Sequence, residues 1–197
     1  MAAGPLPEPT ERVPDWLVRG FTADEFLQMR GLPPHTELID GSLVFASPRM
    51  QWHSWVVELF SKELDRQAPE HLRATREMSV RIGERQMPEP DVIVIAAEAV
   101  DPQATHYLAS DVLLAVEAVS PEFRERDRET KPQKYARAGI QHYWRIEQEG
   151  SRVVAYLYEL DTVTACYAVW GIHHDRLKTS APYPIDIDLT AVGRRGG

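Results

Sequence analysis

The stretch LLAVEAVS, residues 113–120, is an apolar run with a carboxylate, Glu117, at its centre. In a β-strand Glu117 would share one face with Ala115 and Val119, and the opposite face would be just as apolar. Such a strand is expected to be buried on both faces. A buried, ionised and unpaired carboxylate costs several kcal/mol, so Glu117 requires a cation, a metal ion or a proton beside it.

The composition fits one globular domain with a hydrophobic core. Of the 197 residues, 43% are hydrophobic and 26% are charged. The apolar runs are strand-sized, well short of the roughly 20 residues that cross a bilayer, and the N-terminus lacks a secretion signal. We therefore expect a cytoplasmic protein with no membrane contact. A single cysteine, Cys166, agrees with a reducing compartment and is expected to be a small core residue.

The domain organisation is expected to be simple. Residues 1–20 are rich in proline and poor in periodic apolar positions, so they predict a flexible N-terminal arm. Residues 21–190 are expected to form one domain, and residues 191–197 a flexible tail.

The local signals predict an α/β (α+β) fold. Thr22 and Glu25 form a capping box for a short helix, and Asp40-Gly41 marks a β-hairpin turn. Apolar residues spaced by three and four predict a helix over 52–64, and Pro132 and Gly139 delimit a second one. Strands are predicted at 72–82, 91–97, 113–119, 141–147, 151–160 and 163–170. The expected architecture is a mixed β-sheet flanked by helices, with an N-terminal β-hairpin and a C-terminal antiparallel meander.

Two acids stand on predicted buried strands. Asp91 opens the strand VIVI and Glu117 lies inside its own strand. If these strands are neighbours, the two carboxylates can share one hard divalent cation, which prefers oxygen ligands and would offset their desolvation. Such a cation polarises a phosphoryl oxygen and lowers the pKa of bound water, as phosphodiester hydrolysis requires. Lys131 and Lys134 follow on the next helix and could supply a positive charge.

As an ordered set, several motifs resemble the Uma-two family of putative restriction endonucleases, a branch of the PD-(D/E)XK nuclease superfamily. They are ELIDGSLVFASP, QWHSWVVELF, PEPDVIVI, LLAVEAVSP and DRETKPQKYARAGIQHYWRIE, and the resemblance covers roughly residues 20 to 190. It implies a restriction-endonuclease-like core and a Mg²⁺- or Mn²⁺-dependent endonuclease that acts on DNA. It also implies a 5′-phosphate product, and cleavage of both strands makes a homodimer an expected assembly.

The resemblance also implies roles for individual residues. Asp91 and Glu117 would bind the metal, together with the backbone carbonyl of Ala118. The superfamily pattern places its lysine two residues after Glu117, where this chain has Val119. The lysine role would therefore move to Lys131, or in reserve to Lys134. Glu37 and His53 match family-typical positions and could add a ligand or a water contact.

Each residue also has a simpler interpretation. Asp91 alone is typical of a strand start, Glu117 of a buried ion pair, and Glu37 of a solvated strand residue. His53 alone is typical of a boundary residue that is hydrogen-bonded to backbone. Three arginines, Arg124, Arg126 and Arg128, form either a solvated loop or contacts to phosphate.

The charge balance leaves a second class of function open. Thirty acidic against 22 basic residues give a net charge of −8, the wrong sign for a protein that relies on non-specific phosphate contacts. Together with Val119 in place of a lysine, this charge favours the alternative of a catalytically silent binding or oligomerisation module on a nuclease fold. Hydrolysis of another phosphoester is a third hypothesis, because metal chemistry does not choose the substrate.

Overall fold

The computed structural model describes residues 18–46, 48–119 and 126–193. Its helices are α2 (Ala23–Gln28), α3 (Gln51–Gln67) and α4 (Lys131–Arg137), the last continuing a π-helical turn, Arg126–Thr130. The strands are β1 (Glu37–Ile39), β2 (Ser42–Val44), β3 (Leu72–Arg76), β4 (Ser79–Arg81), β5 (Val92–Ala96), β6 (His106–Leu108), β7 (Val112–Ala118), β8 (His142–Glu149), β9 (Arg152–Asp161), β10 (Cys166–His173), β11 (Arg176–Thr179) and β12 (Ile185–Asp188). None of the helices in these ranges is long and apolar enough to cross a membrane.

The centre of the molecule is a six-stranded mixed sheet with the order β10-β9-β8-β7-β5-β3. Only the central pair β7–β8 is parallel, and the other neighbours run antiparallel. A parallel pair needs a crossover connection, and α4 lies in it. The predicted mixed α/β fold with a closing β8–β9–β10 meander is therefore confirmed.

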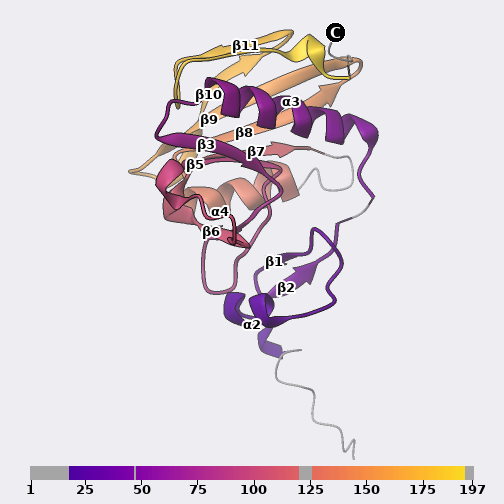
Figure 1. Ribbon diagram of the computed structural model, residues 1–197, viewed down its shortest axis with the longest axis vertical. Helices are drawn as coiled ribbons and strands as arrows, with labels where there is room; N and C mark the ends of the chain where they lie inside the picture. Colours follow the sequence, from indigo (N-terminus) through magenta and orange to yellow (C-terminus); the bar gives the residue numbers. More distant parts are fainter. Residues whose placement is uncertain (1–17, 47, 120–125, 194–197) are drawn as a thin grey trace, which may run out of the picture.

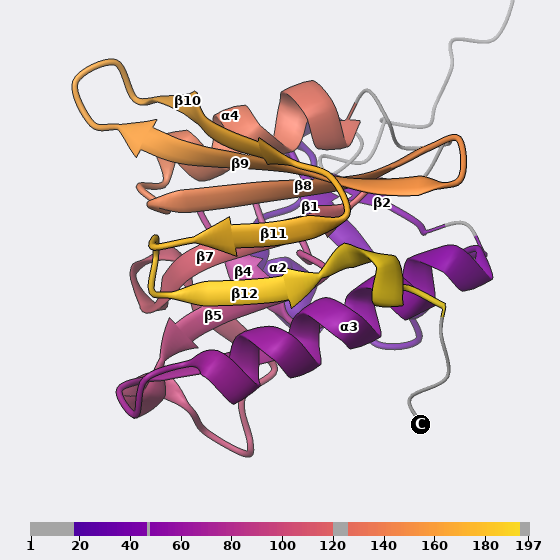
Figure 2. The same cartoon turned by 90° about the horizontal axis from the view of Figure 1, so that it is seen from above.

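The two faces of this sheet are covered by different elements. Figure 1 shows α3 on one side of the sheet and α4 on the other, and Figure 2 shows β11 and β12 on the α3 side. Because side chains alternate along a strand, Val92 and Val94 of β5 point into the core beneath α3, whereas Ile93 and Ile95 pack on the α4 side. Both faces of the central strands are thus buried.

The β1–β2 hairpin and α2 form a smaller lobe on the α4 side (Figure 1). The predicted capping box of α2 is present, since Thr22 and Glu25 bond reciprocally. The hairpin turns at Asp40 and Gly41, both with positive φ, as the sequence predicted. A bridge between Leu38 and Met87 joins the hairpin to the segment that leads into β5.

Some local predictions were wrong. Residues 72–82 form two strands, β3 and β4, because the backbone turns at Glu77, where φ is +53°. Three short strands, β6, β11 and β12, were not predicted. Cys166 is exposed at the start of β10 and is not a core residue, because that strand lies at the edge of the sheet. The predicted arm, residues 1–20, and tail, residues 191–197, lie largely outside the described ranges.

Candidate active site

Alternation along two neighbouring strands brings Asp91 and Glu117 to the same face of the sheet. Val92 is paired with Val116, so Asp91, at the entrance of β5, lies beside the end of β7. The backbone N–H of Ala118 donates a hydrogen bond of 2.8 Å to Asp91 Oδ2. Asp91 is 4% exposed and Glu117 is 2% exposed. The two acids therefore lie buried together on the α4 side.

Helix α4 supplies the partners of Glu117. Lys131 Nζ and the hydroxyl of Tyr135 both donate to Glu117 Oε1, at 2.8 and 2.7 Å. These two residues are four positions apart, so they lie on one face of the helix. Burial raises the pKa of Glu117 well above its ordinary value, although the charge of Lys131 opposes this shift. Among the described residues, a cation and a hydroxyl thus compensate the carboxylate in the apolar run.

Lys131 is surrounded by acids. Its ammonium lies 2.8 Å from Glu117, 2.9 Å from Glu37 and 3.8 Å from Asp127, and the residue is only 3% exposed. Burial alone would lower the pKa of Lys131, but the three carboxylates outweigh it and raise that pKa above its ordinary value. The ammonium therefore stays protonated.

An imidazole and a guanidinium face Asp91. His53 Nε2 lies 3.0 Å from Asp91 Oδ1, and Arg49 Nη1 lies 3.3 Å from the same oxygen. Burial acts to raise the pKa of Asp91, but the hydrogen bond with His53 and the nearby positive charges lower it overall. Asp91 is therefore held as a carboxylate. His53 comes from the first turn of α3, so this helix contributes to the site as well as to the core.

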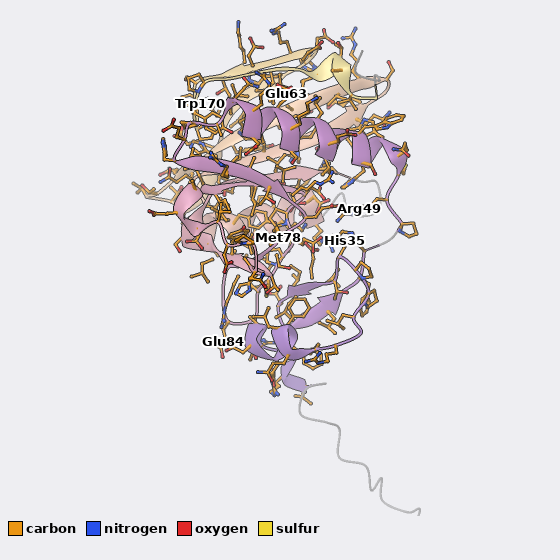
Figure 3. The ribbon with its side chains drawn as sticks, in the orientation of Figure 1. His35, Arg49, Glu63, Met78, Glu84 and Trp170 are labelled. Atoms are coloured by element: carbon orange, nitrogen blue, oxygen red, sulfur yellow. The ribbon has the colours of Figure 1, made fainter. Side chains whose placement is uncertain are left out.

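The hairpin lobe closes the site from the other side. Glu37 of β1 accepts a hydrogen bond of 2.8 Å from the backbone N–H of Glu89, and His35 Nδ1 lies 2.5 Å from the Glu89 carboxylate. Figure 3 labels His35 and Arg49 where this lobe meets the sheet. Burial raises the pKa of Glu89.

These side chains enclose a small pocket of about 40 Å³. A cavity of roughly 10–15 Å³ holds one water, so the pocket has room for an ion or a few waters. It is lined by His35, Glu37, Ala46, Pro48, Arg49, His53, Glu89, Asp91, Glu117, Ala118, Arg126, Asp127 and Lys131.

The donor chemistry of the pocket fits a hard divalent cation. Asp91 and Glu117 offer buried carboxylate oxygens, which are the ligands that such a cation prefers. Within residues 18–46, 48–119 and 126–193, no group of three or more His, Cys, Asp and Glu side chains is arranged to hold a metal ion without further ligands. A cation bound here would therefore complete its coordination with backbone oxygen and waters.

The structure brings most of the predicted site residues together. Those that line the pocket are Glu37, His53, Asp91, Glu117, Ala118 and Lys131. Lys134 lies apart from it, and its ammonium contacts Asp40 at 2.7 Å. Of the three arginines, Arg126 lies 3.2 Å from Glu37, Arg128 pairs with Glu147, and Arg124 lies outside the described residues.

Comparison with known proteins now identifies the family. Residues 23–177 match the model of the Uma2 family, described as "Putative restriction endonuclease". The chain belongs to the Uma2 family. Among solved structures it is similar to "a putative nuclease belonging to DUF820" from Anabaena variabilis ATCC 29413, with 17% sequence identity and a TM-score of 0.65. The match covers 82% of this chain and 89% of that one, and it shows a shared fold. A comparison with curated proteins gives no match.

Four ionisable pocket residues of this Uma2 member had no predicted site role, namely His35, Arg49, Glu89 and Asp127. For His35 and Glu89 the sequence holds a signal. His35 and Glu37 are two apart, as are Glu89 and Asp91, which is the spacing of one strand face. Arg49 precedes α3 in an irregular segment, and no local pattern indicates that it meets Asp91.

Proposed function

We propose that this Uma2 protein is a divalent-metal-dependent endonuclease that hydrolyses DNA phosphodiester bonds. The observation that carries the proposal is the shared pocket of Asp91 and Glu117, two buried acids on adjacent strands with Lys131 beside them. Burial at this depth is costly for carboxylates that serve only packing. Family membership supports the assignment to nucleases.

Asp91, Glu117 and the backbone carbonyl of Ala118 would hold Mg²⁺ or Mn²⁺. A bound divalent cation polarises the phosphoryl oxygen and lowers the pKa of a coordinated water. Lys131, kept protonated by its acidic neighbours, would orient water and stabilise the negative charge that develops on the phosphate. His53 and Arg49 would keep Asp91 ionised and in place. Lys134 is the reserve for the lysine role, with a weaker case because it pairs with Asp40.

DNA is proposed as the substrate because of the family, and not because of a DNA-recognition motif in the sequence. Attack in line with the leaving oxygen would give a 5′-phosphate, and cleavage of both strands would need two sites, as in a homodimer. Arg49 and Arg126 line the pocket and would offset the repulsion between phosphate and the acidic side chains.

Calorimetric titration with Mn²⁺ tests the metal site first. We expect saturable binding to the parent that Asp91→Asn and Glu117→Gln both lose, whereas Glu58→Gln, an exposed acid on α3, binds as the parent does. Plasmid cleavage by the parent should depend on the same two acids. Binding that survives both substitutions, or cleavage that ignores them, would contradict the proposal.

A catalytically silent binding module is the second candidate, and one observation favours it. Both acids proposed to hold the metal already have partners in the described residues: Glu117 has Lys131 and Tyr135, and Asp91 has His53 and the N–H of Ala118. Unfolding of Asp91→Asn without metal separates the two functions. A metal site gains stability when one of its clustered acids is removed, whereas a structural ion pair loses stability.

Hydrolysis of a different phosphoester is the third hypothesis. It is tested by offering other phosphoester substrates to the protein once Mn²⁺ binding has been shown.

A further inference from the structure

Asp127 carries a buried oxygen that the contacts of the pocket do not explain. The residue is 4% exposed, and its Oδ1 has no hydrogen-bond partner among the described residues. The nearest cations are Arg126 Nε at 3.7 Å and Lys131 Nζ at 3.8 Å, both beyond hydrogen-bond distance. An unsatisfied buried acceptor costs about 1–3 kcal/mol, so a fold that keeps one calls for a reason.

The backbone fixes this oxygen in place. Asp127 lies in the π-helical turn before α4, a local geometry that is frequent at functional sites. The hydroxyl of the buried Tyr143 donates to the Asp127 carbonyl oxygen at 2.6 Å and anchors the turn to β8. Asp127 also lies four residues before Lys131 and therefore on the same side of the helix. The carboxylate is thus directed into the pocket that it lines.

Asp127 and Lys131 are spaced so that one water beside them in the pocket can bridge the two side chains. Lys131 directs its ammonium at Glu117 and Glu37, which uses two of its three protons. Two buried polar groups more than 3.5 Å apart raise the question of a bridging water, and a water with two hydrogen bonds of about 2.8 Å spans 3.8 Å when it lies to one side of the line between the two atoms. The pocket, with about 40 Å³, has the room for it.

We propose that Asp127 Oδ1 and Lys131 Nζ together bind one water in the pocket, and that this water is the nucleophile. The water site is argued from the geometry, whereas the role of the water as nucleophile rests on the proposed nuclease function. The water oxygen forms the new bond to phosphorus while the bond from phosphorus to the leaving O3′ breaks. Asp127 takes the proton of the water and later returns it to solvent, and the leaving oxygen takes a proton from solvent.

The protonation chemistry agrees with this assignment. Burial is the main cause that raises the pKa of Asp127 to about 6, close to the range in which a general base is effective. Lys131, by contrast, stays protonated among its carboxylates and can only donate. Of the two groups beside the water, Asp127 is therefore the one that can accept a proton.

A high-resolution crystal structure of the full chain, grown without divalent metal, tests the water site. We expect density for one water within hydrogen-bond distance of both Asp127 Oδ1 and Lys131 Nζ. A protein atom hydrogen-bonded to Oδ1 in place of the water, or no density for a water beside the two side chains, would overturn the proposed water site.

Steady-state cleavage by Asp127→Asn tests the role of the water. We expect kcat to fall by roughly 10²–10⁴-fold, with KM and Mn²⁺ affinity unchanged, because the amide keeps the shape but accepts no proton. Asp127→Glu, which keeps a carboxylate, should recover part of kcat, and Glu58→Gln should match the parent. An unchanged kcat in Asp127→Asn would overturn the nucleophile role while the proposed nuclease function stands. If the parent protein neither binds Mn²⁺ nor cleaves DNA, the proposed function is overturned, and the nucleophile role with it. The crystal structure tests the water site whatever the cleavage experiments give.

Discussion

Strands β5 and β7 separate two buried regions that differ completely in chemistry. On the α3 face, Val92, Val94 and Val116 join an apolar core with Phe60 and Trp144. On the α4 face, at the same end of the same strands, Asp91 lies beside Arg49, and Glu117 lies beside Lys131 and the hydroxyl of Tyr135. The apolar core tolerates exchange of one apolar group for another of similar volume, because hydrophobic burial is non-directional. The charged pocket depends on individual partners, because each buried charge requires its own counter-charge.

The largest effect should come from removing the central cation of the charged region. Lys131→Met keeps the length of the side chain but leaves Glu117 and Glu37 without their shared counter-charge. We expect the free energy of unfolding, measured with urea, to fall by about 3–5 kcal/mol. Adding Glu117→Gln to this variant should restore part of the loss, since it removes the carboxylate left without a cation, whereas Glu37 keeps Arg126 at 3.2 Å.

The matched control for this prediction is Lys134→Met, on the same helix. Lys134 pairs with Asp40, whose side chain is 67% exposed, so the loss should be about 0.2–1 kcal/mol. Equal losses in the two lysine variants would remove the distinction between the buried and the exposed ion pair.

A cavity in the apolar region should have a similar or slightly smaller effect. Leu64 of α3 is fully buried in the core, and Leu64→Ala is expected to cost about 2–5 kcal/mol in urea unfolding. The loss should be independent of pH and should leave Mn²⁺ affinity unchanged in the folded protein. Val163→Ala, at a fully solvent-exposed position, serves as the control and should change stability by less than about 0.5 kcal/mol. A strong pH dependence of the Leu64→Ala loss would show that the two regions are coupled.

The smallest of the three effects is a change in pH dependence. Burial is the main cause that raises the pKa of Asp127 from 3.8 to about 6, so the unfolded chain ionises first as the pH rises. Stability should therefore fall between about pH 4 and pH 6, by at most about 3 kcal/mol from this residue. Asp127→Asn should lack that part of the fall, while the raised pKa of Glu117 keeps a decrease of the same sign. Urea unfolding on both sides of this window measures the difference, and identical pH profiles for parent and variant would contradict it.

The sequence predicted the fold best where the signal is local. The capping box of Thr22 and Glu25 and the turn at Asp40-Gly41 are set by neighbouring residues, and both are confirmed. Strands β6, β11 and β12 were missed because they have three or four residues each, too few for a periodic pattern. The break at Glu77 was missed because a positive φ in a residue other than glycine has no sequence signature here.

For the candidate site, acids at the start of and inside apolar strands indicated Asp91 and Glu117, and the family resemblance favoured Lys131 on the following helix. These patterns arise because strand and helix geometry decide which side chains share a face. Arg49 and Glu89 reach the pocket only because the hairpin lobe packs against the sheet, a contact between segments distant in the chain. The sequence could not place Lys131 and Lys134 relative to the pocket either, because only the tertiary structure brings Lys131 to Glu117 and Lys134 to Asp40.

The crossover between β7 and β8 has a consequence for protein engineering. Asp127, Lys131 and Tyr135 all come from this one connection, which is also the segment that makes the two strands parallel. Residues 126–140 therefore carry the cation, the hydroxyl and the unpartnered carboxylate of the pocket on one continuous segment. An engineer who replaces this segment would change all three groups at once, while Asp91 and Glu117 stay in place, and would need to keep Tyr143 of β8, which anchors Asp127.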